Sequence, residues 1–141
     1  MNASVISVDT INAYKETEYR VNAEQPFTLK INQFSPDLFA LHERYNVKSG
    51  AYLTACNPYS QPTDPMENIR RQRNFITDMR AAGYKVVSGL GKHPSNDWPG
   101  EESCLILGLD FETATALGAE LEQNALIWCG VDFRPELVLL R

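Results

Sequence analysis

The sequence predicts an α+β fold with a ferredoxin-like split βαβ core, and the order of its predicted elements is the main reason. Six segments after Lys48 read as strand, helix, strand, strand, helix and strand, which is the βαββαβ order of that unit. An apolar segment near the end of the chain predicts one extra C-terminal strand. These seven segments are 51–56, 65–82, 85–89, 103–109, 111–123, 126–131 and 137–140.

An N-terminal extension, residues 1–47, is predicted to be a helix-strand-helix addition to this core. Helical spacing of apolar residues favours the first helix, and alternating apolar and polar residues are typical of a half-buried strand. Ser35 followed by Pro36 predicts the second helix, because a hydroxyl caps a helix and proline suits its first position. We expect Gly50 to mark its end. The first helix and the extended segments are Val5–Glu16, Glu18–Val21 and Phe27–Ile31.

The best-defined helix of the core is predicted at 65–82. Asp64 with Glu67 three residues later fits an N-terminal capping box, and Gly83 fits the left-handed position beyond the helix end. The apolar residues at helical spacing are expected to form its buried stripe. They are Met66, Ile69, Ile76 and Met79.

Residues 89–100 are rich in glycine, proline and small polar residues, which predicts a long hairpin loop. Trp98 in this loop is expected to cover a site or to pin the loop onto the domain. The apolar run that follows Ser103 predicts a central strand buried on both faces. We find no linker or repeat and expect residues 1–141 to form one domain, with the extension packed on 48–141.

Composition narrows the class of protein. The chain has 141 residues, of which 43% are hydrophobic and 22% charged, as in ordinary soluble globular domains. Its net charge of −5 argues against nucleic acid as a partner, because nucleic-acid binding favours a basic surface. No apolar run approaches the ~20 residues that span a bilayer. Met1–Asp9 lacks the features of an export signal, so a cytoplasmic location is expected.

The three cysteines and two histidines lack the spacing of a metal site. Buried free thiols in a reducing compartment are the simplest interpretation. Cys56 would be a nucleophile only if its pKa were lowered, and a buried strand-end thiol is the preferred alternative. We therefore expect neither a metal nor another cofactor.

The predicted topology brings three polar loops to one end of the sheet. In a right-handed split βαβ unit the loops 57–63, 89–102 and 123–125 share that end, and polar loops on a rigid scaffold are where binding sites are usually built. The opposite connections, near Gly83 and Asp110, are short. The sequence therefore predicts a site at the rim formed by the three loops.

A set of short motifs in the same region resembles a small bacterial family catalogued as domain of unknown function 3293. The motifs are Thr54-Ala55-x-Asn57-Pro58-Tyr59-Ser60, Glu67-Asn68, Glu101/Glu102 before an apolar strand, and Gln123-Asn124-Ala125. The resemblance covers roughly residues 45–140. It implies no activity, substrate or cofactor, and it adds weight to the asparagines, the glutamine and one of the two glutamates.

The amide side chains of the rim suit recognition, because each offers both a donor and an acceptor. Asn57, Asn124 and Ser60 would bind a ligand, with Gln123 beside them. The alternative is that these side chains cap turns or satisfy the last carbonyls of a helix.

Charged residues of the rim have two interpretations as well. Asn68 and Arg71 would line an anion site at the start of the 65–82 helix, or Arg71 would belong to a solvated basic face. Glu101 and Glu102 point to opposite faces of a strand, so at most one of them would serve as a general base. His93, a lone histidine in the predicted loop of the same region, is a further candidate for ligand binding or catalysis.

The function expected from these observations is binding of a small polar or anionic, nucleotide-like ligand at the rim. One alternative is a protein-interaction or oligomerisation module without a ligand site, in which the free sheet face packs on the N-terminal strands or on a second copy in a homodimer. The other alternative is a metal-independent hydrolase or transferase with Glu101 or Glu102 as the general base.

Overall fold

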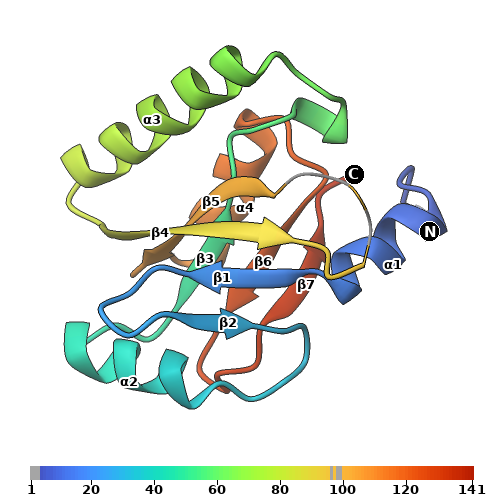
Figure 1. Ribbon diagram of the computed structural model, residues 1–141. Coiled ribbons are helices and arrows are strands. Elements are labelled where there is room, and N and C mark those ends of the chain that lie inside the picture. Colours follow the sequence, from blue (N-terminus) through green and yellow to red (C-terminus); the bar gives the residue numbers. More distant parts are fainter. Residues whose placement is uncertain (1–3, 96, 98–99) are drawn as a thin grey trace.

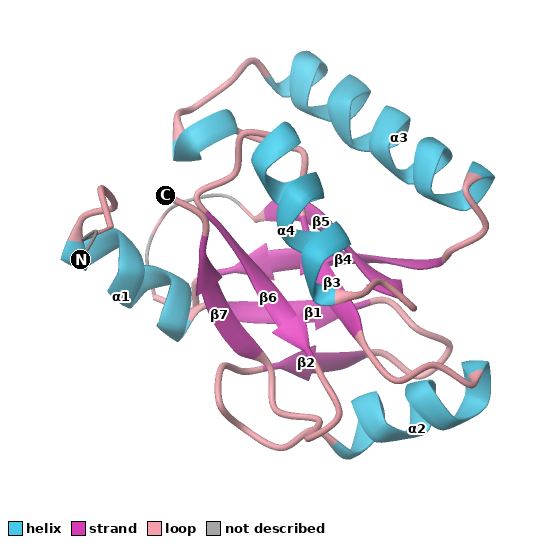
Figure 2. Ribbon diagram, turned by 180° about the vertical axis from the view of Figure 1, so that it is seen from behind, coloured by secondary structure: helices cyan, strands magenta, loops and turns pink. Residues whose placement is uncertain are grey.

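The computed structural model describes residues 4–95, 97 and 100–141, and a curled antiparallel sheet of seven strands organises them. The strands lie in the order β2-β1-β4-β5-β3-β6-β7. The sheet bends into a half-barrel, with α3 and α4 on its outer side and α1 and α2 at its two ends (Figures 1 and 2). In chain order the elements are α1 (Val8–Glu16), β1 (Glu18–Val21), β2 (Phe27–Leu29), α2 (Pro36–Tyr45), β3 (Gly50–Leu53), the 3₁₀ turn η1 (Pro58–Ser60), α3 (Pro65–Ala81), β4 (Lys85–Lys92), β5 (Glu101–Leu107), α4 (Phe111–Glu120), β6 (Ala125–Cys129) and β7 (Glu136–Leu139).

Successive strand residues point to opposite sides of the sheet, and side chains on both sides are buried. On β3, Ala51 and Leu53 pack under α3 and α4, whereas Tyr52 points into the concave side of the half-barrel. On β5, Ile106 faces the two helices and Leu105 faces the concave side. The apolar run after Ser103 is therefore a central strand covered on both faces, as the sequence predicts.

The α+β class is confirmed, but the sheet as a whole is a half-barrel and not the open four-stranded sheet of a ferredoxin-like unit. The difference arises at β4, which continues to Lys92 through residues expected to be loop. This second half of β4 pairs with β1, with Glu18 opposite Lys92 and Val21 opposite Gly89. The N-terminal extension thereby adds two strands to the same sheet, and the predicted helix-strand-helix extension is a helix, two strands and a helix.

The concave face is filled from within the chain. Val21 and Leu29, from β1 and β2, are fully buried there together with Ile127 and residues of α2. The N-terminal strands therefore extend the sheet itself, and the curl of the sheet turns their side chains toward its concave side. They do not form a separate layer over it. A homodimer stays a prediction.

The ends of α3 are as predicted, but its buried stripe is not. The Asp64 carboxylate accepts from the Glu67 backbone N–H at 3.1 Å, and Gly83 has a φ of +96° beyond the helix end. The prediction for Met66 and Ile69 is wrong, since these side chains are 71% and 41% exposed. The buried residues of α3 are Gln72 and Phe75, and Ile76 and Met79 pack against the same core, so burial is concentrated in the second half of the helix.

Gly50 does not end α2, whose last cap is Asn46 in a left-handed conformation. Gly50 instead opens β3 where the backbone of β5 comes very close. A Cβ atom at this position would lie 2.6 Å from the carbonyl oxygen of Ile106. Close strand approach therefore requires this glycine. In the described part of the chain, no helix is long and apolar enough to cross a bilayer.

Candidate ligand-binding site

The three predicted rim segments lie together at one end of the half-barrel. The Tyr59 N–H donates to the carbonyl of Glu122 at 2.6 Å, which joins the 57–63 turn to the end of α4. The Asn57 Nδ2 donates to Glu101 Oε2 at 2.9 Å, which joins the same turn to β5. Backbone and side-chain hydrogen bonds therefore fix the relative positions of all three segments.

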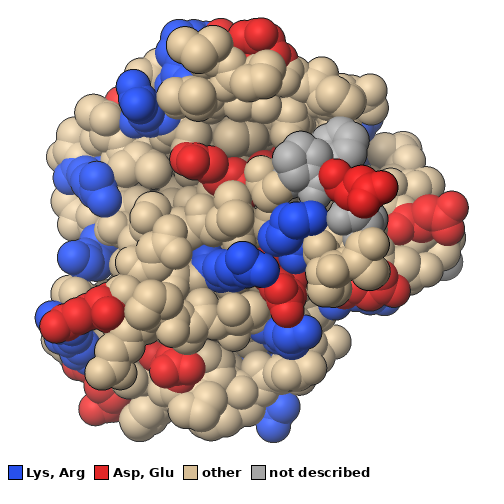
Figure 3. All heavy atoms as spheres, in the orientation of Figure 1, with Lys and Arg blue, Asp and Glu red and all other residues tan. Residues whose placement is uncertain are grey.

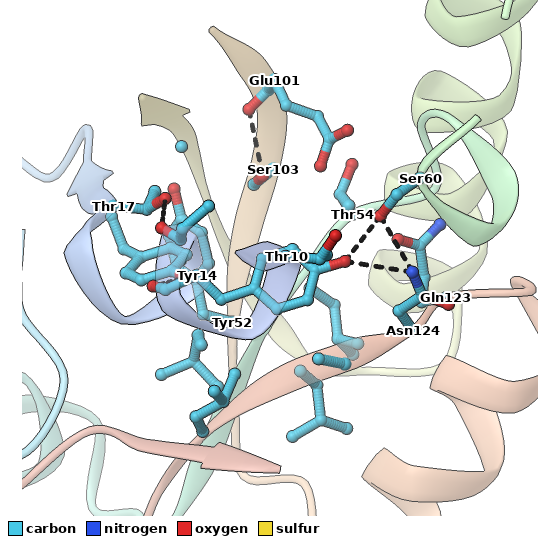
Figure 4. A pocket seen from close by; sticks show the side chains of 18 of the residues that line it. Thr10, Tyr14, Thr17, Tyr52, Thr54, Ser60, Glu101, Ser103, Gln123 and Asn124 are labelled. Carbon is cyan, nitrogen blue, oxygen red and sulfur yellow. Dashed lines mark hydrogen bonds between the residues drawn. The ribbon is translucent and has the colours of Figure 1, made fainter. Parts of the chain in front are cut away.

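These segments border a cavity of about 400 Å³ in the mouth of the half-barrel, with α1 on one side. The floor is apolar and includes Ile127 and Leu137, which belong to the hydrophobic core of the concave side. Polar side chains of the rim and of α1 surround it (Figure 4). An apolar floor below a ring of polar groups is the usual construction of a small-molecule site.

Glu101 is the only acidic residue that the strands of the sheet contribute to the described cavity lining. Burial raises the pKa of its carboxyl group, and the hydrogen bond from Asn57 acts in the opposite direction. Glu102, the next residue, is exposed on the other face of β5. The alternation along the strand therefore selects Glu101 as the glutamate of the site, a choice that the sequence leaves open.

Asn57 is held by a compact network that gives it a left-handed φ of +47°. Its Oδ1 accepts from Asn68 Nδ2 at 2.8 Å and from the Thr63 N–H at 3.0 Å. Its own N–H donates to Asn68 Oδ1 at 2.9 Å. Asn68 lies on α3 and makes no appearance in the cavity lining, so it positions Asn57, which in turn holds Glu101.

A second network attaches α1 to the rim. The hydroxyls of Tyr14 and Ser60 lie 2.6 Å apart, and Asn124 Nδ2 donates to both at 3.1 Å. The Oδ1 of Asn124 accepts from Arg141 Nη1 at 3.1 Å, and the Arg141 guanidinium lies 4.1 Å from the centre of the Tyr59 ring. Figure 4 shows the three joined side chains of Tyr14, Ser60 and Asn124.

The remaining predicted residues lie near the cavity but have other partners. Arg71 donates from Nε to the carbonyl of Ala55 at 2.7 Å and from Nη2 to that of Leu121 at 3.1 Å. It supports the rim from behind and does not line this cavity, so its place in an anion site stays a prediction. Gln123 lines the cavity, and its Nε2 donates to the carbonyl of Cys56 at 3.0 Å.

His93 contacts a residue of α1, and Cys56 is a buried thiol. The His93 Nε2 lies 2.7 Å from Glu16 Oε2, so this ring connects the end of β4 to α1, and it also borders the cavity. Cys56 is buried, and burial raises the pKa of its thiol. In the described ranges, no three His, Cys, Asp or Glu side chains are grouped as metal ligands. The prediction for Trp98 falls outside the described residues.

Sequence reasoning missed the hydroxyl groups of the cavity. Thr10 and Tyr14 lie on one face of α1, at the i and i+4 spacing of a helical stripe, and Thr17 is the residue that caps the end of this helix. Tyr19 and Tyr52 enter from β1 and β3. The sequence signal for these residues was a stripe of hydroxyl-bearing side chains on a predicted amphipathic helix. The sequence did not place that helix beside the cavity, because its position depends on the curl of the sheet.

The face of the molecule seen in Figure 3 carries mixed charge. On the face seen in Figure 3, Lys and Arg side chains alternate with Asp and Glu side chains without forming a single basic field. Among the described residues that line the cavity itself, none is Lys or Arg.

The fold is an α+β domain whose curled seven-stranded sheet holds a cavity at its mouth. The family described as "Protein of unknown function (DUF3293)" matches residues 53–126, just over half of the chain, and the chain belongs to that family. The matched range includes Asn57, Glu101 and Asn124 but not α1. No curated protein and no solved structure matched the chain.

Proposed function

We propose that this protein binds a small polar molecule in the cavity at the mouth of its half-barrel. The observation that carries the proposal is the cavity of about 400 Å³, with an apolar floor and the half-buried Glu101 carboxylate above it. Protein sites for drug-sized ligands have similar volumes and the same combination of apolar walls with a few fixed polar groups. The ligand-binding residues would be Glu101, Asn57, Ser60, Gln123 and Asn124.

A cavity-filling substitution tests this proposal. Ala13 lines the cavity from α1, so Ala13→Trp would place a large ring inside it. Asn12→Trp puts the same ring on the exposed side of the same helix and is the matched control. We expect small polar fragments to shift the amide NMR signals of Gly91, Ser103 and Ala125 in the wild type and in Asn12→Trp, but not in Ala13→Trp. Equal shifts in all three proteins, or none in the wild type across a broad fragment library, would refute it.

A metal-independent hydrolase or transferase is the second candidate, and the position of Glu101 favours it. A general base needs a pKa closer to neutral than that of an ordinary glutamate, and burial moves the pKa of Glu101 in this direction. The test is turnover of a panel of chromogenic esters and amides in the presence of a chelator. This candidate requires Glu101→Gln to abolish turnover and Glu102→Gln to preserve it.

We also propose that residues 1–141 form one domain and that β4, β5, β3 and β6 with α3 and α4 form a ferredoxin-like unit within the half-barrel. The pairing of β1 with β4 supports the first proposal. The neighbour order β4-β5-β3-β6 supports the second.

A further inference from the structure

The lining of the cavity is rich in hydrogen-bond acceptors, because most of its donors are already used. Two hydroxyl hydrogens have no acceptor among the described residues: that of Thr10, whose oxygen accepts from Ser7, and that of either Tyr14 or Ser60. Five hydroxyl groups of the lining lie within hydrogen-bond distance of backbone carbonyl oxygens. A carbonyl oxygen only accepts, so each of these hydroxyls must donate to it and keeps its own oxygen as an acceptor, although that of Thr54 already accepts from the Cys56 N–H at 3.0 Å. They belong to Thr17, Tyr19, Tyr52, Thr54 and Ser103 and donate to the carbonyls of Ala13, Tyr14, Arg20, Glu102 and Glu101, at 2.7, 2.5, 2.8, 2.6 and 3.1 Å.

The amide groups follow the same rule. The Nδ2 of Asn57 donates to Glu101, and that of Asn124 donates to the two rim hydroxyls. The Nε2 of Gln123 donates to the carbonyls of Cys56 and Leu121. A ligand that satisfies most of these groups therefore brings its own N–H or O–H donors.

The charged residues of the lining also favour a ligand that donates hydrogen bonds. Asp9 and Glu101 are the acidic residues of the described lining, and His93 is the only basic one. The Glu101 carboxylate has one oxygen, Oε2, occupied by Asn57, whereas Oε1 accepts no hydrogen bond from the described residues. Asn68 holds Asn57, and Asn57 restrains this carboxylate through Oε2, which leaves Oε1 available to a ligand.

Aromatic rings complete the pocket for a flat cation. Tyr19 and Tyr52 pack edge to face with ring centres 5.4 Å apart, and both residues line the cavity. The faces of such rings attract cations. Guanidinium-like groups combine planarity, positive charge and several parallel donors, and they form strong two-point hydrogen bonds with carboxylates.

Resting on the proposed function, we propose that the cavity selects a planar N–H-bearing cation, of the amidinium or guanidinium class, with Glu101 as its counter-ion. This inference replaces the expectation of an anionic ligand, because the arginine assigned to an anion site donates to backbone carbonyls behind the rim.

Three probes of nearly identical shape test the charge preference directly: benzamidine as a cation, benzamide as a neutral molecule and benzoate as an anion. Affinities are measured by NMR titration at pH 7.5 on the full chain. We expect benzamidine to bind at least about tenfold more tightly than the other two, which is the effect of one charge-assisted contact. Benzoate or benzamide binding as tightly as benzamidine would overturn the inference, and so would the failure of all three to bind at 10 mM.

Two variants assign the effect to one carboxylate. Glu101→Gln keeps an acceptor for Asn57 but removes the charge, and we expect it to lose about tenfold in benzamidine affinity with benzamide unchanged. Glu102→Gln, the exposed neighbour, should bind as the wild type does. An unchanged benzamidine affinity in Glu101→Gln would overturn the inference. The fragment comparison of Ala13→Trp with Asn12→Trp tests the proposed function separately from the cation preference. If the cavity binds only neutral or anionic fragments, the cation preference is refuted and the proposed function is not.

Discussion

Asn68→Ala is the substitution that tests most directly how the rim is assembled. The Asn68 side chain makes two good hydrogen bonds with Asn57 at 2.8 and 2.9 Å, and a third, longer contact of 3.4 Å with the carbonyl of Thr63. Each good bond contributes about 1 kcal/mol, and an abandoned, partly buried backbone N–H adds a further cost of about 1 kcal/mol. Alanine returns roughly 0.6 kcal/mol through its better helix propensity. The expected net loss in the free energy of unfolding is about 2 kcal/mol.

The assay is thermal and urea unfolding, followed by circular dichroism. For a chain of 141 residues the entropy of unfolding is about 0.3 kcal/mol/K, so the loss corresponds to a fall in Tm of about 7 °C. The control is Asn74→Ala, an exposed position in the same helix where only the helix propensity changes. We expect this control to be slightly more stable than the wild type. If Asn68→Ala is as stable as Asn74→Ala, the network around Asn57 does not hold the rim.

Three further predictions concern the cavity and the sheet. Burial raises the pKa of Glu101 above its ordinary 4.5, so its ionisation destabilises the fold as the pH rises through that raised value. In scans from pH 4 to 7.5, the Tm of Glu101→Gln should therefore rise relative to the Tm of the wild type. A Tm difference that stays constant over this range would contradict the prediction. Asp9, His93, Tyr19 and Tyr52 share the cavity with Glu101 and are unchanged in both proteins. Tyr14→Phe removes the hydroxyl that Ser60 and Asn124 contact and should cost about 1 kcal/mol; hydrogen exchange of α1 should accelerate, and unchanged exchange would mean that other contacts hold α1. Gly50→Ala forces a Cβ to 2.6 Å from a backbone oxygen and should cost about 2 kcal/mol or more in urea unfolding; wild-type stability would show that the strands separate easily.

Local signals in the sequence predicted the elements well, because they depend on neighbours along the chain. The cap at Asp64, the glycine at Gly83 and the buried strand after Ser103 are of this kind. The predicted closeness of the rim loops also agrees with the structure, since Asn57 and Glu101 are hydrogen-bonded. It followed from the order of the elements and the hand of their connections.

The remaining features depend on contacts between distant segments. Gly89 to Lys92 read as loop because glycine is a poor strand former, yet pairing with β1 makes them strand. That pairing curls the sheet and brings α1, with its hydroxyl stripe, to the cavity. Arg71 had the right position for an anion site, but the two carbonyl groups that it contacts come from segments 16 residues before and 50 residues after it. No local pattern contains this information.

A crystal structure of the protein soaked with benzamidine is the single measurement that tests the cavity most directly. We predict electron density for the amidinium group within hydrogen-bond distance of the Glu101 carboxylate, above the apolar floor and with Asn57 still in contact. A benzamidine found elsewhere on the protein while the cavity holds only solvent would contradict the account.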